Sequence, residues 1–200
     1  MSEDPGDRPY IRSRRFPREE EANPVARLYT RTGDKGTTGI LGGPRVSKDH
    51  ARIQVVGDVD EANAAIGLAL AFQADPTVIA ILRNVQNTLF TVGAEVGSRP
   101  KAKVPRVTRA HVETLEHDME VLDVGEIREF VMPRGPAAVA ALHFARTVVR
   151  RAERACIALN RKETLNPELL AYVNRLSSLL FQIAVWVQRQ VRAPEEHPTY

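Results

Sequence analysis

Three arginines recur at four-residue intervals in a run patterned as a helix: Arg146, Arg150 and Arg154. This spacing stacks their guanidinium groups in a column on one helix face, where like charges repel. An anionic ligand would relieve that repulsion, and arginine binds phosphate or carboxylate through a planar pair of N–H groups. The alternative is a solvated face with salt bridges, Glu153 being one partner. An apolar stripe lies one step around the helix, at Val139, Leu142, Val149 and Cys156.

The second candidate is a glycine- and threonine-rich loop at residues 29–43. Its glycines Gly33, Gly36 and Gly39 permit positive φ and close backbone approach, so amide groups can converge on an anion. Further donors and cations on this segment are Thr30, Thr32, Thr37, Thr38 and Lys35, and Lys48 follows shortly after it. The loop lacks the Gly-Lys-Ser/Thr that opens the helix of a Walker A motif. The alternative is an ordinary hairpin turn at 33–36.

Asp60 and Asn174 are polar residues near apolar seams. Asp60 is expected in the first turn of a helix, where the helix dipole stabilises a carboxylate. Asn174 lies one step off the seam of the last helix, so it either joins helices or contacts a ligand. His143 shares a face with Thr147 and Arg150. We interpret it as structural, because no second histidine falls at metal-ligand spacing.

Composition limits the function classes. The 200 residues include 28 basic and 25 acidic side chains, with a net charge of +3. They lack the basic patch with aromatic residues that is typical of nucleic-acid binding. One cysteine, Cys156, excludes an internal disulfide and fits a reducing compartment, so a cytoplasmic protein is expected. No run is expected to span a membrane, and the N-terminal residues lack the apolar segment of a secretory signal.

One helical domain is expected at residues 27–192, because 43% hydrophobic residues at this length support a single core. Residues 1–26 combine prolines with charges of both signs and are expected to form a disordered arm. Residues 193–200 are expected to be a flexible tail.

Five amphipathic runs predict an all-α fold. Their expected positions are from about Gly57, from Pro76 to Gly97, from Thr108, from Pro136 to about Asn160, and from the N-cap Asn166 onward. Apolar residues alternate at four- and three-residue steps, which is typical of helices packed nearly parallel. The fold class is therefore an elongated five-helix bundle preceded by the loop. Only 53–56, and secondarily 27–30, are candidate strands.

Six motifs follow one another between residues 27 and 188. They are YTRTGDKGTT at 29–38, RVSKD at 45–49, VDEAN at 59–63, FVMP at 130–133, ALHFARTVVRRAER at 141–154 and NRLS at 174–177. Together they resemble the PduO-type ATP:cob(I)alamin adenosyltransferases. Several motifs in one order make this resemblance far more specific than any one of them.

The resemblance implies a ferritin-like five-helix bundle that assembles as a homotrimer and binds ATP and a corrinoid at subunit interfaces. It implies transfer of the 5′-deoxyadenosyl group of ATP to cobalt with release of triphosphate. This activity belongs to cobalamin biosynthesis, and an enzyme that has it is also named a cob(I)yrinic acid a,c-diamide adenosyltransferase. Mg²⁺ would be bound through the ATP phosphates and not by protein ligands. A cobalamin reductant and an adenosylcobalamin-dependent mutase are the implied partners, with no nucleic acid and no membrane.

Site residues follow from the resemblance by motif. The ATP site would comprise Thr30, Arg31, Thr32, Gly33, Thr38, Gly39, Lys48, Arg150, Arg151, Glu153, Arg154 and Asn174. The catalytic residues would be Asp60, Arg150 and Phe130. Asp60 would pair with Arg150 and hold it in place, while Phe130 would lie under the corrin ring and displace the lower axial ligand.

The chemistry implied by the resemblance fits these residues. Co(I) is itself a nucleophile, so no side-chain base is required. The reaction needs a positioned ribose C5′ and a stabilised triphosphate leaving group. Two alternatives stay open: an ATP-responsive protein that binds or delivers cobalamin with little transferase activity, and a structural bundle whose arginine column is fortuitous.

Several positions depart from the family pattern. Ser178 stands where aspartate is usual, and Val185-Trp186 stands where arginine-tyrosine is usual. The loss of both charges, seven residues apart on one helix, indicates a changed interface or polar network. Arg134 replaces a glycine and is expected to place a cation beside the corrin pocket. His50 stands at a position that tends to be acidic.

Overall fold

The computed structural model describes residues 31–199. The expected arm at 1–26, the candidate strand at 27–30, which includes the loop residue Thr30, and Tyr200 lie outside the described residues. The described elements are β1 Thr37–Gly39, β2 Arg45–Ser47, α1 Ala51–Leu70, α2 Pro76–Val96, α3 Arg109–Val121, α4 Ala137–Asn160 and α5 Pro167–Gln190. The predicted all-α bundle of five helices is confirmed.

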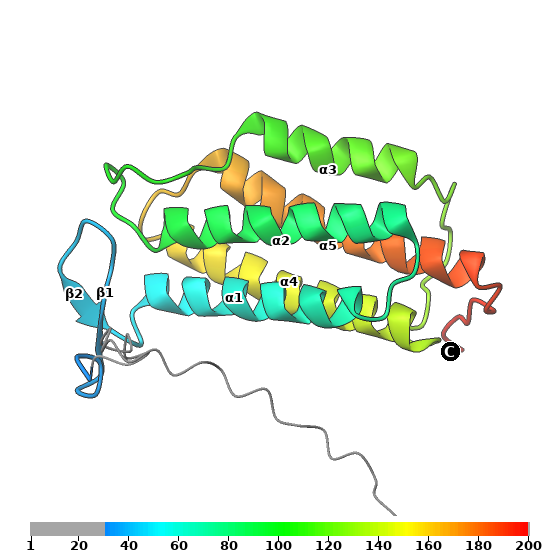
Figure 1. Ribbon diagram of the computed structural model, residues 1–200, viewed down its shortest axis with the longest axis horizontal. Coiled ribbons are helices and arrows are strands. Elements are labelled where there is room, and N and C mark those ends of the chain that lie inside the picture. The colour runs from blue at the N-terminus through cyan, green and yellow to red at the C-terminus, as the bar shows by residue number, and fades with distance from the viewer. Residues whose placement is uncertain (1–30, 200) are drawn as a thin grey trace, which may run out of the picture.

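The helices lie side by side along one long axis (Figure 1). α1 packs against α2 and α4, α4 packs against α5, and α5 packs against α3. Their inward faces form one apolar core in which Ile66, Leu142, Leu176 and Ile183 are fully buried. This core holds α4 and α5, which carry five of the predicted site residues, in a fixed mutual position.

Side-chain caps explain why α2 and α5 begin where the sequence predicts. Asp75 accepts hydrogen bonds from the backbone N–H of Thr77 (2.8 Å) and Val78 (3.1 Å). Asn166 accepts one from Glu168 N at 3.0 Å. A proline follows each cap at the first helical position, where a missing N–H is tolerated.

The predicted start of α1 at Gly57 is wrong, and so is the candidate strand at 53–56. α1 begins earlier because His50 caps it, with Nδ1 accepting from Arg52 N at 3.2 Å. β-branched residues favour a strand locally, but Val55 is buried in the helical core, and tertiary packing overrides that preference. Asp60 consequently lies in the middle of α1, so the helix dipole does not account for this carboxylate.

The expectation that no run is apolar enough to cross a membrane also needs correction. Within residues 31–199, α5 alone meets that standard by length and composition, with a mean hydropathy of 1.3 over its best window. Because 56% of that window is buried inside the bundle, this hydropathy fits a core helix that packs on α3 and α4.

A short hairpin closes one end of the bundle, next to the start of α1 (Figure 1). β1 and β2 pair antiparallel, with Thr38 opposite Val46. The segment between them is attached to the end of α2, since Leu41 N donates to Gly97 O at 2.9 Å and Leu41 forms a parallel bridge with Ser98. The glycine-rich loop is therefore fixed to the helical body.

The buried carboxylate of Glu95 joins three segments at the hairpin end. It accepts hydrogen bonds from Arg106 Nη1 (3.1 Å), Val107 N (2.8 Å) and Asn166 Nδ2 (3.1 Å). These donors come from the α2–α3 connection and from the cap of α5. A buried carboxylate needs such partners, so this network fixes the end of α2 relative to the start of α5.

The opposite end carries the α3–α4 loop, residues 122–136, and the C-terminal segment, residues 193–199. Both lack helix and strand. The C-terminal segment, predicted as a tail, folds back on this loop, where Met132 N donates to Glu196 O at 2.8 Å.

Candidate functional site

The arginine column, Arg146, Arg150 and Arg154, lies on α4 as predicted. Arg146 is half-buried, and its guanidinium carbon lies 5.9 Å from the centre of the Phe181 ring, which permits a cation–π contact. Burial, and secondarily the charge of Arg150, lower the pKa of Arg146. Its Nε is buried without a hydrogen-bond partner among the described residues. A cation in this setting favours an anionic partner.

Arg150 and Arg154 are exposed, and within residues 31–199 their guanidinium groups form no ion pair or hydrogen bond. The intervening Arg151 differs, because it pairs with Glu61 on α1 and its Nε lies 3.7 Å from Oδ1 of Asp58 on the same helix. The interpretation of a face laced with salt bridges therefore applies to Arg151. It does not account for Arg150 and Arg154 of the column.

Asp60 and Arg150, predicted to pair, form no ion pair within the described chain. Asp60 is exposed on α1, and the α1 carboxylates that do meet α4 belong to its neighbours. The pairing of Asp60 with Arg150 therefore stays a prediction.

Asn174 on α5 contacts α4 beside the column. Its Nδ2 donates to Glu153 Oε1 at 2.7 Å. Two residues predicted for the ATP site, 21 positions apart in the sequence, are therefore neighbours in space. Of the two interpretations of Asn174, this bond supports the one that joins helices, and the exposed position leaves its carbonyl oxygen available to a ligand.

The predicted turn at 33–36 is present in the glycine-rich loop, with Gly36 N donating to Gly33 O at 3.1 Å. Gly36 has a φ of +78°, which favours glycine. Lys48 closes the loop, since its N–H donates to Gly36 O at 2.9 Å and a Cβ on Gly33 would lie 3.3 Å from its Nζ. The two interpretations of the loop are therefore compatible, because a hairpin turn here brings glycine backbone and a lysine ammonium together.

Arg45 organises the same loop, although it was not among the predicted site residues. Its guanidinium donates to the carbonyl oxygens of Thr32 and Thr37 at 2.8 Å each, and to Thr37 Oγ1 at 3.2 Å. An arginine at the start of a three-residue strand gives no local signal for this role. Its place in the RVSKD motif was the available indication.

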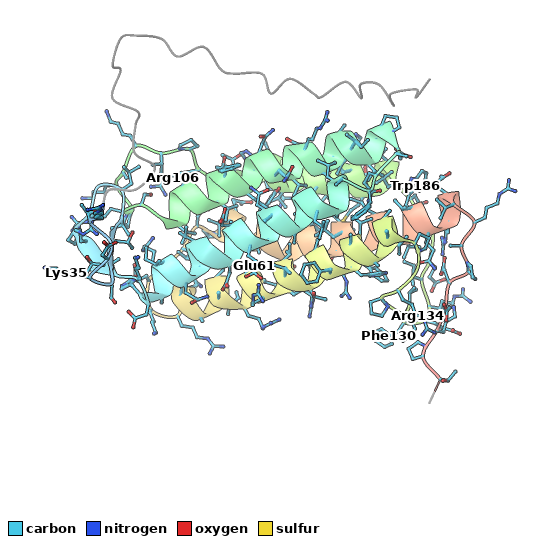
Figure 2. All side chains as sticks on the ribbon, turned by 60° about the horizontal axis from the view of Figure 1, so that its bottom comes forward. Lys35, Glu61, Arg106, Phe130, Arg134 and Trp186 are labelled. Atoms are coloured by element: carbon cyan, nitrogen blue, oxygen red, sulfur yellow. The ribbon has the colours of Figure 1, made fainter. Side chains whose placement is uncertain are left out.

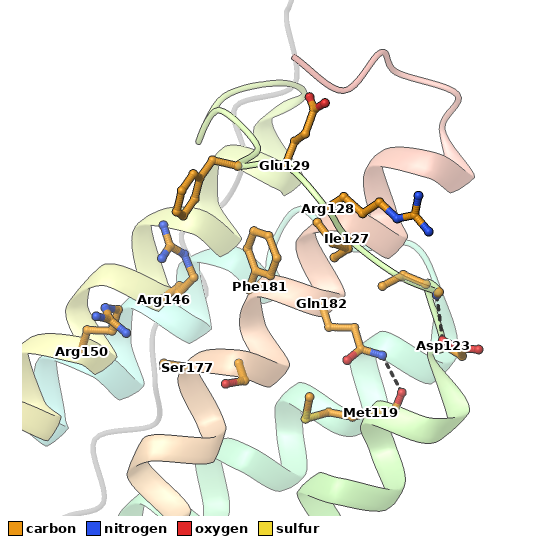
Figure 3. A pocket seen from close by; sticks show the side chains of 14 residues that line it. Met119, Asp123, Ile127, Arg128, Glu129, Arg146, Arg150, Ser177, Phe181 and Gln182 are labelled. Atoms are coloured by element: carbon orange, nitrogen blue, oxygen red, sulfur yellow. Dashed lines mark hydrogen bonds between the residues drawn. The ribbon is translucent and has the colours of Figure 1, made fainter. Parts of the chain in front are cut away.

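A pocket of about 630 Å³ lies where α4 and α5 meet the α3–α4 loop (Figure 3). Arg146 and Arg150 reach it from α4, and Phe181 and Gln182 from α5. The lining residues are Met119, Asp123, Val124, Gly125, Ile127, Arg128, Glu129, Phe130, Arg146, Arg150, Ser177, Ser178, Phe181 and Gln182. We call this cavity the Phe130 pocket; its size suits a large organic ligand.

The walls of the Phe130 pocket combine aromatic rings with cations. Phe130 is 79% exposed, an unusual position for a phenylalanine, and marks an apolar surface open to a partner or ligand. Gln182 Nε2 donates to the carbonyl oxygens of Met119 (2.5 Å) and Leu122 (2.8 Å), which secures α3 to α5. Phe181 was not among the predicted site residues, and its role as a pocket wall was missed.

His143 lies behind this wall. Its ring is buried between α4 and α5, 6.1 Å from the ring of Phe181. Burial, and secondarily the charge of Arg146, lower the pKa of His143 to about 4. It is therefore neutral at pH 7, and both ring nitrogens lack a partner among the described residues. These properties agree with a structural histidine.

The hairpin and the Phe130 pocket lie at opposite ends of the bundle. Figure 2 shows Lys35 at one end and Phe130 at the other. α4 spans 24 residues between them, a length of about 36 Å. One nucleotide cannot touch both regions of the same chain.

Comparison with known proteins decides the family. The family model described as cobalamin adenosyltransferase matches residues 28–187, which include the hairpin, the arginine column and the Phe130 pocket. The chain belongs to the cobalamin adenosyltransferase family. A corrinoid adenosyltransferase of Citrobacter freundii is 40% identical over 163 residues, covering 79% of this chain and 93% of that protein. One of Mycobacterium tuberculosis (strain ATCC 25618 / H37Rv) is 42% identical over 166 residues, covering 78% and 86%.

Solved structures of this family share the fold. A phenylalanine-to-alanine variant of a PduO-type ATP:corrinoid adenosyltransferase from Lactobacillus reuteri, complexed with cobalamin and ATP, aligns with a TM-score of 0.80 and 28% identity. The alignment covers 86% of this chain and 99% of that chain. An arginine-to-lysine variant complexed with ATP aligns with a TM-score of 0.79.

The departures from the family pattern occupy different environments. Ser178 is exposed and lines the Phe130 pocket, whereas Val185 is fully buried in the core. The two positions therefore do not share one polar surface. Trp186 is half-buried, with its Nε1 lacking a partner among the described residues. Arg134 pairs with Glu196 and is not among the lining residues of the Phe130 pocket, and its expected place beside the corrin stays a prediction.

Proposed function

We propose that this member of the cobalamin adenosyltransferase family transfers the 5′-deoxyadenosyl group of ATP to cob(I)alamin, giving adenosylcobalamin and triphosphate. The observation that carries the proposal is the continuity of the arginine column with the Phe130 pocket, since Arg146 and Arg150 belong to both. The neighbouring structures from Lactobacillus reuteri hold cobalamin and ATP, the two ligands this surface suits.

The nucleotide half would lie along the outer face of α4. Arg150 and Arg154, which form no ion pair within residues 31–199, would bind the polyphosphate, with Arg151, Glu153 and Asn174 completing this side of the site. Lys48 and the glycine-rich loop, with Thr30, Arg31, Thr32, Gly33, Thr38 and Gly39, would contribute backbone donors, hydroxyl groups and charge. In the reaction a Co–C5′ bond forms, the C5′–O bond breaks, and triphosphate leaves with the electron pair. The cations stabilise that developing charge.

Mg²⁺ would be held through the ATP phosphates. Residues 31–199 contain no group of three or more His, Cys, Asp or Glu side chains placed to hold a metal ion. The protein contributes the cationic surface, and the nucleotide contributes the oxygen ligands that Mg²⁺ prefers.

The site would be completed by a second copy of the chain. Because the hairpin and the Phe130 pocket of one chain lie at opposite ends, the hairpin of one subunit would close over the arginine column of its neighbour. The exposed Asp60 would pair with Arg150 across the same boundary. A head-to-tail contact of this kind closes into a ring, and we propose a trimer.

Phe130 would lie against the lower face of the corrin ring. An apolar ring there excludes an axial ligand, which favours four-coordinate cob(II)alamin and eases its reduction to the Co(I) nucleophile. The high exposure of Phe130 at the pocket mouth supports this role. We further propose a cytoplasmic enzyme of cobalamin biosynthesis, supplied by a cobalamin reductant and serving an adenosylcobalamin-dependent mutase.

The second candidate is an ATP-responsive protein that binds or delivers cobalamin. It is favoured by Ser178, because the α5 residues that line the Phe130 pocket include no carboxylate to balance Arg146 and Arg150. Incubation with ATP, Mg²⁺ and chemically reduced cobalamin separates the candidates. Adenosylcobalamin and triphosphate in equal amounts support the enzyme. Binding of both ligands without product supports the carrier, and binding of neither overturns both.

A further inference from the structure

The α3–α4 loop positions Phe130 although residues 126–134 include no helix or strand. A side chain that must lie flat against a ligand needs a fixed backbone, and an irregular loop does not supply one by itself. The contacts that hold this loop therefore decide where Phe130 points.

Two hydrogen bonds near Phe130, one between backbone groups and one from a side chain, connect the loop to the C-terminal segment. Met132 N donates to Glu196 O at 2.8 Å, and His197 Nδ1 lies 3.1 Å from the carbonyl oxygen of Phe130. Because a carbonyl oxygen only accepts, Nδ1 carries the proton in this bond. The C-terminal segment thus holds the loop backbone at Phe130 through a side chain and at Met132 through a backbone bond.

Charged side chains reinforce the same junction. Arg134 of the loop pairs with Glu196, and Glu129 of the loop lies 3.4 Å from His197. After Phe130 in the sequence, the Arg134 cation therefore meets a carboxylate. Before it, the Glu129 carboxylate meets a histidine ring. Exposed pairs contribute little individually, but two pairs, one backbone–backbone bond and one side-chain–backbone bond together fix how the loop lies on the C-terminal segment.

The C-terminal segment is in turn secured to α5. Arg192, with a φ of +54°, turns the chain after the helix. Gln188 Nε2 then donates to Pro194 O at 2.5 Å, and Arg189 Nε donates to Glu195 Oε1 at 2.5 Å. α5 also supplies one wall of the Phe130 pocket. These contacts therefore fix the loop, through the C-terminal segment, to the helix that forms that wall.

We propose that residues 193–199 form a clip that holds Phe130 at the mouth of its pocket, with Arg134, Glu196 and His197 as positioning residues for the corrin-facing ring. The inference rests on the proposed function for its effect on turnover. It also gives Arg134, which replaces a glycine of the family pattern, a specific role on this chain: an anchor for Glu196.

Charge reversal tests the clip. In the full-length protein, Glu196→Arg places two cations together and should release the loop, as should Arg134→Glu. The double variant Arg134→Glu/Glu196→Arg restores an opposite-charge pair and should recover most of the loss. Arg109→Glu, which breaks an exposed arginine–glutamate pair on α3 away from the pocket, is the matched control.

Two measurements separate the clip from the proposed function. In the ligand-free protein, the rate of hydrogen–deuterium exchange at residues 128–133 should rise in each single variant. It should return to the wild-type rate in the double variant. With ATP and cob(II)alamin plus a reductant, the single variants should lower kcat about tenfold, as expected for a misplaced group, with the KM for ATP nearly unchanged. The electron paramagnetic resonance signal of bound four-coordinate cob(II)alamin should fall in parallel.

Unchanged exchange at 128–133 in both single variants would overturn the clip, whatever their activity. Raised exchange with an unaltered kcat and cob(II)alamin spectrum would also overturn the positioning role. Wild-type protein that binds neither ATP nor cobalamin would instead defeat the proposed function, and the exchange experiment would still decide whether the clip exists.

Discussion

Asn174 Nδ2 donates to Glu153 Oε1 over 2.7 Å, which joins α5 to α4 beside the arginine column. Glu153 lies three residues after Arg150 and one before Arg154 on the same helix. A glutamate at that spacing can reach Arg150 and neutralise it. The bond to Asn174 directs the carboxylate away from that partner and so keeps the column cationic.

Asn174→Ala should therefore raise the KM for ATP about tenfold, the size expected for losing a hydrogen bond to a charged group. The melting temperature should change little, because Asn174 is exposed. Initial rates at varied ATP, with thermal unfolding in parallel, test this. Asn87→Ala, another exposed asparagine on α2, is the control. An unchanged KM for ATP would remove Asn174 from the nucleotide site.

Sharing of the site between subunits predicts complementation. Lys48→Ala disables the hairpin side and Arg154→Ala the column side, so each variant alone should be nearly inactive. In rings formed by equal co-expression, each junction receives an intact hairpin and an intact column with a probability of about one quarter, so activity should recover to about a quarter of wild type. Co-purified, doubly tagged protein provides the measurement. No recovery above the separate variants would place both halves within one chain.

Phe130→Ala should impair adenosylation that starts from cob(II)alamin and spare ATP binding. Because the side chain is 79% exposed, the free energy of unfolding should change by no more than about 0.5 kcal/mol. Steady-state rates with cob(II)alamin, compared with ATP binding by calorimetry, test the role. Phe90→Ala, equally exposed on α2, is the control. Weakened ATP binding with normal cob(II)alamin conversion would contradict the assignment.

Asp60→Asn should slow turnover by about tenfold or more, because an unpaired Arg150 loses its orientation, while stability of the isolated chain stays nearly unchanged. Asp60 is exposed and forms no ion pair within residues 31–199, so its contribution to the monomer fold is small. Turnover and melting temperature measured together test this, with Glu113→Gln on α3 as control. A large drop in melting temperature at constant specific activity would show that Asp60 is structural.

His143 predicts how stability depends on pH. Its pKa is about 4 when folded and about 6.5 when unfolded, so only the unfolded chain gains its proton as pH falls below 6.5. Stability is therefore unaffected by this group above pH 6.5 and is lost progressively down to about pH 4. Between pH 7 and pH 5 the expected loss is about 2 kcal/mol.

Urea unfolding at the two pH values measures this loss, and His143→Leu should abolish most of it. Leucine fits an apolar setting in which the imidazole nitrogens have no described partner. If the wild type and His143→Leu lose stability in parallel, the histidine is not the group responsible.

Local signals predicted most helix boundaries but not all. Asp75-Pro76 and Asn166-Pro167 specify α2 and α5 through cap hydrogen bonds that depend only on neighbouring residues. The start of α1 was missed because its cap is a histidine and because Gly57 and a β-branched run oppose a helix locally. Burial in the core outweighs those preferences, and burial depends on the whole fold.

The candidate site also has a part that local sequence patterns predict and a part that depends on the whole fold. The regular spacing of Arg146, Arg150 and Arg154 was visible in the sequence and is confirmed on α4. The pairing of Arg151 with Glu61, and of Arg134 with Glu196, joins residues far apart in the chain, so no local pattern signals it. The three-residue strands β1 and β2 are too short to show an alternating pattern.

The distance between the two ends of the bundle also bears on how mutations would act in a mixed population. In a closed ring each polypeptide serves two reaction centres, lending its hairpin to one and its aromatic cavity to the next. A copy altered only at Lys48 would spoil one centre and leave the other sound. A copy that cannot join the ring would inactivate no reaction centre of the remaining copies. Mutations that prevent folding should therefore be recessive, whereas mutations of the shared surfaces should be partly dominant.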